Sequence, residues 1–157
     1  MTRSIRWAKA DDWPAISLFR YESSMVHYAT MPQNFGHQPP KPMDENSVMG
    51  WIARHSLEVL LACDDGVPVG FCVMEIRHPP HDQSHFTAYG LILDVFVSTM
   101  YRRHGIARQL IIAMRDHLRA QQVHELILDV YEYNTPAKQL YINLGFQTEK
   151  TTMAWKF

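Results

Sequence analysis

The hydrophobic and polar positions of this chain repeat with two periods, and each period predicts a different kind of element. Apolar residues three and four positions apart, such as Trp13, Ile16 and Phe19, indicate helices that bury one face. Short apolar runs, such as 91–97, indicate buried strands. In chain order the predicted elements are a strand over 4–9, helices over 14–27 and 44–55, strands over 59–63, 67–77 and 91–97, a helix over 107–122, a strand over 125–130, a helix over 135–144 and a strand over 151–157.

Turn and capping residues mark where several of these elements begin or end. Asp64-Asp65-Gly66 is a hairpin turn signal between two predicted strands. Asp44 is a helix N-cap, and Thr135-Pro136 and Gly145 begin and end a later helix. The segment 31–42 is rich in proline, so we expect a surface loop there, near a site entrance.

The order of the elements and the composition predict one α/β domain. The order β-α-α-β-β-β-α-β-α-β contains two strand-helix-strand connections, which favours a mixed sheet. Hydrophobic residues make up 46% of the chain and charged residues 20%, as in compact globular domains. A chain of 157 residues buries enough surface to fold without disulfides or metals. We therefore expect a single domain over residues 1–157.

Charge and hydropathy exclude some classes of partner. Fifteen Lys and Arg residues against sixteen Asp and Glu residues give a formal net charge of −1, which does not favour nucleic-acid binding. The longest apolar stretch, 67–74, is far shorter than the roughly 20 residues of a membrane span. The amino terminus lacks the apolar region of a secretion signal. We expect a cytoplasmic protein with no nucleic-acid or membrane partner, and no disulfide between Cys63 and Cys72.

A basic, glycine-containing turn joins the predicted strand 91–97 to the helix that follows. Its sequence is Arg102-Arg103-His104-Gly105-Ile106-Ala107-Arg108. The first amides of a helix have no partner within the helix and lie at the positive end of its dipole. Gly105 and Ala107 let a ligand approach this backbone closely. The turn therefore suits a phosphate group, although an ordinary strand-to-helix connection can contain the same residues.

Two motifs resemble those of the GNAT superfamily of N-acetyltransferases. Arg102-x-x-Gly105-x-Ala107, after an Asp-Val-Phe-Val strand, is similar to the family's acetyl-CoA pyrophosphate motif. The second cofactor and catalytic segment of the family resembles Leu128-x-Val130-x-x-x-Asn134-x-x-Ala137-x-x-Leu140-Tyr141-x-x-x-Gly145-Phe146. The resemblance implies a GNAT fold of the α/β class, whose mixed central sheet has splayed parallel middle strands and about four flanking helices. It also implies acetyl-CoA as cosubstrate.

The resemblance implies roles for individual residues. In this family the cofactor arm enters the gap between the splayed strands, so backbone groups of Val95, Phe96 and Val97 would bind it, and Asn134 would contact its other side. Arg102 would begin the pyrophosphate site, whose amides come from Arg103, His104, Gly105, Ile106, Ala107 and Arg108. Tyr141 would be the general acid that protonates the leaving thiolate. The alternative for Tyr141 is an aromatic side chain of the core.

Acetyl transfer to an amine also needs a proton acceptor, because an amine with a pKa of about 10.4 is protonated at neutral pH. Asp94 interrupts a strand that otherwise has the pattern of a buried one, and it lies beside the implied splay. It is our leading candidate for the catalytic base, directly or through water, but it could equally fix a cationic substrate or a nearby backbone group. Asp129, Glu75 and Glu132 are further candidates, and water chains serve as the base in many family members.

Histidines suggest two other sites. Three lie in one proline-containing loop: His78, His81 and His85. No cysteine accompanies them, and a zinc site needs four placed ligands, so we expect no metal there. His27, with Pro32 and Phe35, resembles a pattern near the acceptor site of some family members.

These inferences predict an acetyl-CoA-dependent N-acetyltransferase that acts by direct attack of a primary amine in a ternary complex. The acceptor would be a small-molecule or peptide amine. The alternatives are a non-catalytic acyl-CoA-binding or regulatory module of the same fold, and an assembly domain with a vestigial cofactor site. Eleven residues follow Phe146, which implies a shortened final strand pair that another subunit could complete. A homodimer is what the family resemblance suggests.

Overall fold

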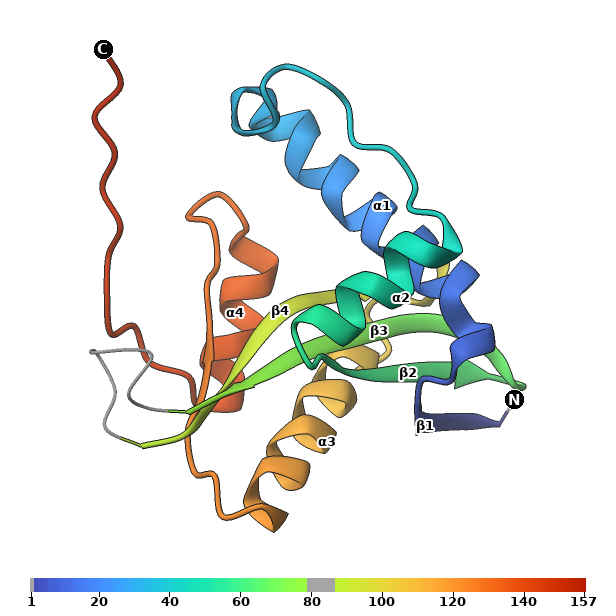
Figure 1. Cartoon of the computed structure of the whole chain (residues 1–157). Helices are drawn as coiled ribbons and strands as arrows, with labels where there is room; N and C mark the ends of the chain where they lie inside the picture. The colour runs from blue at the N-terminus through green and yellow to red at the C-terminus, as the bar shows by residue number, and fades with distance from the viewer. Residues whose placement is uncertain (1, 79–86) are drawn as a thin grey trace.

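The computed structural model describes residues 2–78 and 87–157, which form a five-stranded sheet with helices on both faces (Figure 1). The strands are β1 (Arg3–Trp7), β2 (Glu58–Asp64), β3 (Val67–Arg77), β4 (Tyr89–Val97) and β5 (Leu126–Leu128). They lie in chain order, antiparallel from β1 to β4 and parallel between β4 and β5. The predicted α/β class with a mixed sheet is confirmed.

Helices cover the two faces of this sheet. They are α1 (Trp13–Thr30), α2 (Glu45–Arg54), α3 (Ile106–Ala120) and α4 (Thr135–Leu144). Ile16 of α1 and Val48 of α2 belong to one cluster of buried side chains, whereas Leu110 and Met114 of α3 belong to another. The pair α1 and α2 therefore covers one face, and α3 covers the opposite face (Figure 1).

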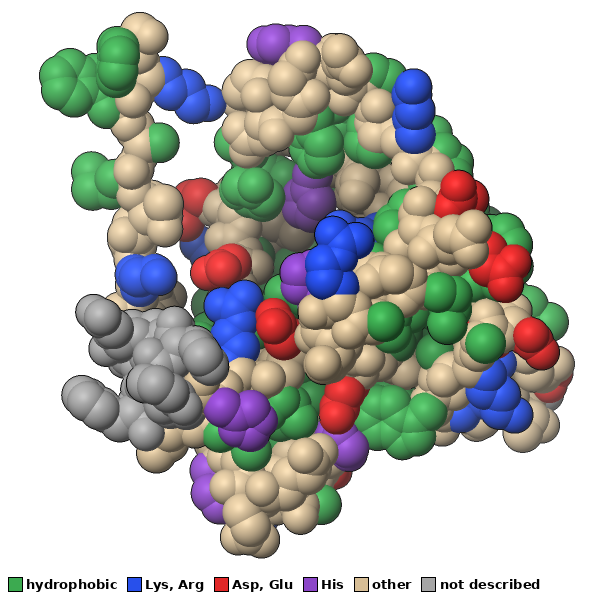
Figure 2. Space-filling model, viewed as in Figure 1, with side chains coloured by type: hydrophobic (Ala, Val, Ile, Leu, Met, Phe, Trp, Pro, Cys, Tyr) green, Lys and Arg blue, Asp and Glu red, His purple; other side chains and the backbone are tan. Residues whose placement is uncertain are grey.

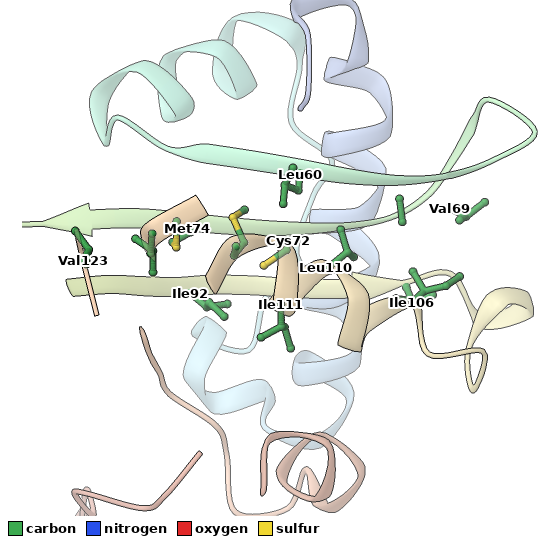
Figure 3. Close-up of a cluster of buried hydrophobic side chains, with 13 residues drawn as sticks. Leu60, Val69, Cys72, Met74, Ile92, Ile106, Leu110, Ile111 and Val123 are labelled. Carbon is green, nitrogen blue, oxygen red and sulfur yellow. The ribbon is translucent and has the colours of Figure 1, made fainter. Parts of the chain in front are cut away.

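Alternate residues of β2 enter the two clusters. Leu60 and Ala62 lie in the cluster under α3, and Val59 and Leu61 lie in the cluster under α1 and α2. Side chains of a strand point alternately to its two faces, so a continuously apolar strand is stable when both faces are covered. Figure 3 shows the cluster under α3, in which Leu60 and Leu110 face the same apolar layer.

Most turn and cap residues act as the sequence predicts, but the N-cap residue of α4 is Asn134 rather than Thr135, because the side chain of Asn134 accepts the hydrogen bond from the amide of Ala137. Asp65 (φ +47°) and Gly66 (φ +83°) form the left-handed pair that joins β2 to β3, which suits a two-residue hairpin turn. Asp44 caps α2, since its carboxylate accepts a hydrogen bond of 2.8 Å from the amide of Ser47. Gly145, with φ +99°, ends α4. Cys63 and Cys72 are buried and free.

The predicted strand over 151–157 is wrong. Segment 147–157 leaves the end of α4 and does not join the sheet (Figure 1). Its alternation of apolar and polar residues suits a strand, but a strand also needs a neighbour for its backbone groups, and this segment has none within the described chain. The second predicted strand-helix-strand connection is therefore incomplete. The strand before α4 is also shorter than predicted, ending at Leu128 rather than 130.

The surface is mixed in charge. Figure 2 shows acidic, basic and histidine side chains intermixed on the face in view, in keeping with the formal net charge of −1. Within residues 2–78 and 87–157, no helix has both the length and the apolar composition needed to cross a membrane.

Candidate active site

The strand β4 loses one of its two neighbours half-way along its length. From Gly90 to Ile92 it pairs with both β3 and β5. A β-bulge follows at Leu93, because Met74 lies opposite Ile92 whereas Val73 lies opposite Asp94. Beyond the bulge, β4 keeps its β3 partner up to Val97, but β5 does not continue beside it in the described chain. This half of β4 therefore has an edge to which an extended ligand could add.

The turn after β4 presents the amino terminus of α3 to an open space. Arg103 (φ +63°) and Gly105 (φ +75°) are both left-handed. Gly105 is the N-cap residue of α3, and no side chain in the described chain caps this helix. A Cβ atom at Gly105 would meet no atom within 4 Å. The first amides of α3 therefore lack a capping side chain, which an anion site at a helix start requires, and binding of an anion there remains a prediction.

Arg102 is anchored to β4 itself. Its Nε donates a hydrogen bond of 2.8 Å to the carbonyl of Val97, and its guanidinium carbon lies 5.3 Å from the centre of the Phe96 ring. This contact places a cation at the end of the free edge and beside the turn. It also occupies the carbonyl of Val97, which the family resemblance assigns to the cofactor arm.

Asp94 lies just beyond the bulge, with only 12% of its side chain exposed. Ser23 of α1 donates a hydrogen bond of 2.8 Å to Oδ1, and Nη1 of Arg20 lies 3.6 Å from Oδ2. Burial raises the pKa of Asp94 to about 6, although Ser23, Arg20 and the amide of Val95 each act to lower it. A carboxyl group of this kind changes its charge close to neutral pH.

Tyr141 of α4 interacts electrostatically with Asp94. Burial raises the pKa of Tyr141 to about 12, and electrostatic interactions with Cys72 and Asp94 act in the same direction. Its ring packs against Phe146, with 5.8 Å between the ring centres. The structure thus brings together two residues 47 positions apart that the sequence predicts as base and acid, and both side chains are largely buried.

The other carboxylates are less suited to accept a proton here. Glu75 is held by Arg77, whose Nε and Nη2 both lie 3.2 Å from its Oε2. Glu132 is 93% exposed at its side chain and pairs with Lys138. Asp129 is exposed. Among these candidates, Asp94 is the one that combines burial with a position beside the end of β5.

Asn134 is the N-cap residue of α4. Its Oδ1 accepts a hydrogen bond of 3.4 Å from the amide of Ala137. This hydrogen bond occupies Oδ1 of Asn134 and stabilises the start of α4, the helix that carries Tyr141. A contact between Asn134 and the cofactor arm remains a prediction.

An aromatic cluster that sequence reasoning missed joins α1 to the loop before α4. His27 Nδ1 lies 2.5 Å from the hydroxyl of Tyr133, and the rings of Tyr131 and Tyr133 stack with 5.4 Å between their centres. Asn34 also donates to the hydroxyl of Tyr131 at 3.4 Å. Burial lowers the pKa of His27, which favours the neutral form of its ring. The alternation Tyr131-x-Tyr133 after β5 was the available signal, but only the fold shows that these rings meet His27.

The histidine loop falls mostly outside the described chain. His81 and His85 lie in 79–86, and His78 is the last residue described before that segment. Within residues 2–78 and 87–157, no group of three or more His, Cys, Asp or Glu side chains is arranged to hold a metal ion.

Comparisons with known proteins identify the family of this chain. The sequence matches the Acetyltransferase (GNAT) family over residues 23–146. This match spans most of the chain, so the chain belongs to the GNAT acetyltransferase family and is an acyltransferase. The resemblance inferred from the two motifs is confirmed.

Individual relatives agree with this family. The L-amino acid N-acetyltransferase AaaT of Escherichia coli (strain K12) is 27% identical over 94% of this chain and 84% of its own length. An aminoglycoside N(6')-acetyltransferase type 1 of Salmonella typhimurium is 26% identical over 64% of this chain and 69% of its own length. The fold is also similar to that of a tetramutant of the BH1408 protein from Bacillus halodurans, with a TM-score of 0.86, 23% identity, and coverage of 98% of this chain and 99% of that chain.

Proposed function

We propose that this enzyme transfers an acetyl group from acetyl-CoA to a primary amine by direct attack within a ternary complex. The observation that carries the proposal is the placement of Asp94 and Tyr141, on β4 and α4, where each is within electrostatic reach of the other beside the free edge of β4. A buried carboxylate that titrates near neutral pH and a buried phenol that does not are suited to accept one proton and donate another.

The residues of the turn fit the diphosphate group of acetyl-CoA. Amides from Arg103 to Arg108 include the uncapped start of α3, and the open space at Gly105 lets the diphosphate approach them. The free edge of β4, at Val95, Phe96 and Val97, would pair with the pantetheine arm as a neighbouring strand would. Asn134 would contact that arm from the start of α4.

Asp94 would make the acceptor amine nucleophilic. At pH 7 a carboxyl group with a pKa of about 6 is mostly ionised, so it can take a proton from the ammonium group directly or through water. The neutral nitrogen then attacks the carbonyl carbon of the thioester and forms the new carbon-nitrogen bond, and it loses its second proton to solvent as the amide forms. Ser23 and Arg20 would hold the carboxylate in place during this step.

Tyr141 would act on the leaving group, the thiolate of CoA. As the carbon-sulfur bond breaks, its hydroxyl gives a proton to the departing thiolate, and solvent returns a proton to the phenol afterwards. A phenol with a pKa of about 12 stays protonated throughout the neutral range, so it is always available as a donor. The products are the acetylated amine and free CoA.

The cysteines favour direct attack over an acetyl-enzyme intermediate. Cys63 and Cys72 are both buried. Burial and the charge of Asp94 raise the pKa of Cys72, which keeps its sulfur as an unreactive thiol at neutral pH. Neither cysteine is suited to receive the acetyl group before the amine does.

The experiment that tests this function is a panel of amines assayed with acetyl-CoA. Because two relatives are named for L-amino acids and aminoglycosides, the panel includes both, together with polyamines and peptide amino termini. Release of free thiol and the mass of an acetylated amine would support the proposal. Binding of acetyl-CoA without thiol release from any amine would favour the non-catalytic acyl-CoA-binding module.

Replacing Asp94 by asparagine tests the base. In the wild type, kcat should fall about tenfold per pH unit below the pKa of about 6, because protonated Asp94 accepts no proton. In Asp94→Asn the break in the pH profile near pH 6 should disappear, because the rate then follows only the fraction of neutral amine, and turnover at pH 7 should be about tenfold lower, with water as a poorer acceptor. The loss should shrink at pH 9, where more of the amine is already neutral. An equal loss at both pH values would instead assign Asp94 to substrate positioning.

Replacing Arg102 by alanine tests the cationic part of the turn. We expect a weakening of acetyl-CoA binding of about three- to tenfold, since one charge-assisted contact is lost while the backbone amides of the turn remain. Calorimetric titration measures this change in affinity. The melting temperature of the variant shows whether loss of the hydrogen bond to Val97 lowers its stability. Binding that disappears entirely would mean that Arg102, not the amides, holds the diphosphate.

A further inference from the structure

The guanidinium group of Arg20 lies beside the proposed base. Its Nη1 is 3.6 Å from Oδ2 of Asp94, which is close enough for an ion pair but too long for a hydrogen bond. Within residues 2–78 and 87–157, the N–H groups of Arg20 donate no hydrogen bond to another residue. The side chain is 35% exposed. The donors of this guanidinium are therefore free to bind a ligand that reaches Asp94.

Trp51 of α2 fixes the position of this cation. The guanidinium carbon of Arg20 lies 4.1 Å from the centre of the Trp51 ring. The contact joins α1 to α2, which lie on the same face of the sheet (Figure 1). An arginine that stacks on an indole ring keeps its charge and its N–H donors, and the ring limits the side-chain freedom that ligand binding would otherwise remove. Arg20 is thus pre-organised to bind an anion.

The charges at this position favour a ligand that carries two opposite charges. Asp94 attracts an ammonium group, and Arg20 is the one Lys or Arg residue of α1. An amine bound at Asp94 places the group on its neighbouring carbon close to the guanidinium, because the two side chains are only 3.6 Å apart. A carboxylate in that place would accept paired hydrogen bonds from the planar fork of Arg20. A second cationic group there would be repelled.

We propose that Arg20, held in place by Trp51, binds a carboxylate of the acceptor and so selects amines whose adjacent carbon carries that group. Arg20 is then a specificity-determining residue, and Trp51 is a positioning residue that acts through it. The inference rests on the proposed acetyl transfer, because it names the class of acceptor for the same site. Asp94 and Arg20 would bind the two ends of one zwitterionic acceptor.

Matched pairs of acceptors test the role of Arg20. Glycine, alanine, leucine and phenylalanine are each compared with the corresponding amide, which keeps the amine and loses the carboxylate. The quantity compared between variants is the ratio of kcat/KM for the acid to kcat/KM for the amide. Arg20→Gln should lower this ratio about tenfold to hundredfold, since charge-assisted hydrogen bonds to the carboxylate are lost. Both members of a pair depend on Asp94, so an effect of the substitution on the base cancels in the ratio. An unchanged ratio would overturn the proposal.

Three further variants separate this role from a general effect of charge or folding. Arg54→Gln removes the same charge from an exposed position at the end of α2 and should leave the ratio unchanged. Arg20→Lys keeps the charge without the fork and should lower the ratio by less than Arg20→Gln, with an unchanged circular dichroism spectrum. An equal fall of the ratio in Arg54→Gln and Arg20→Gln would refute a carboxylate site at Arg20.

Substitutions of Trp51 test its positioning role. Trp51→Leu removes the ring under the guanidinium and should lower the ratio about two- to fivefold, whereas Trp51→Phe keeps an aromatic face and should retain most of it. A merely structural role would change stability in both variants without changing the ratio. Equal ratios in Trp51→Leu and the wild type would therefore refute the positioning of Arg20 by Trp51.

Binding without turnover separates this inference from the proposed function. The same acids and amides are titrated by calorimetry into the enzyme saturated with CoA, which supplies no acetyl group. The acids should bind more tightly than the amides to the wild type, and this advantage should be lost in Arg20→Gln. Such binding with no thiol release from acetyl-CoA would refute the transfer and support the carboxylate site. Thiol release with no dependence of acid binding on Arg20 would support the transfer and refute the carboxylate site.

Discussion

Gly105→Glu is expected to abolish measurable acetyl-CoA binding, a loss of at least about 10²-fold in affinity. The new carboxylate would lie where the diphosphate meets the start of α3, and two like charges about 4 Å apart near a protein surface repel by about 4 kcal/mol. A Cβ atom at this position would meet no other atom within 4 Å, so the substitution does not begin with a steric clash. Calorimetric titration of the folded variant measures the effect.

The control for this variant is Gly105→Gln. Both substitutions place a side chain on a residue with φ +75°, and each should cost about 1–2 kcal/mol of stability for the same backbone reason. Only glutamate adds charge, so glutamine should retain most of the binding. Equal affinity in Gly105→Glu and the wild type would remove the turn from the cofactor site.

Tyr141→Phe is expected to lower kcat by about 10²-fold, within the usual range for the loss of a general acid, while acetyl-CoA affinity stays nearly unchanged. The substitution keeps the ring that packs against Phe146, so α4 should remain seated. The departing thiolate would then leave without its proton. Turnover and melting temperature are measured on the same preparation.

Tyr21→Phe serves as the matched control, because it removes a phenol hydroxyl from α1 at a position outside the proposed machinery. Its turnover should equal that of the wild type. If Tyr141 were only a core residue, Tyr141→Phe would melt at a lower temperature with normal turnover of the folded enzyme. That result would contradict the role of Tyr141 as the general acid that protonates the thiolate of CoA.

Local signals in the sequence were sufficient for most elements of the fold. The hairpin at Asp65 and Gly66 depends on two adjacent left-handed residues, and the cap at Asp44 depends on a residue three positions away. The helix stripe that includes Leu110 and Met114 follows from the period of the helix. Each of these features is determined by residues close together in the chain, so its physical cause is visible in the sequence.

One part of the candidate site could be predicted from the sequence, because its motif lies within a single strand-to-helix connection. The turn from Arg102 to Arg108 lies between a strand and the helix that follows it, and the structure places Gly105 at the start of that helix as expected. The pairing of His27 with Tyr133 was missed, because these residues are 106 positions apart and neither belongs to a motif that names the other. Local sequence patterns do not show which residues far apart in the chain come into contact in the fold.

The sequence by itself determined the order of the elements up to the helix that ends at Gly145, the mixed α/β class, and the membership in the GNAT family that its motifs indicate. Only the tertiary structure decided the environment of Asp94, since its pKa depends on burial and on Ser23 and Arg20 of a helix about 70 residues earlier. Only the tertiary structure also decided whether segment 151–157 forms a strand of the sheet. Its alternation is a local property, but a strand exists only when a neighbouring backbone accepts and donates its hydrogen bonds, and that neighbour is not encoded in the segment.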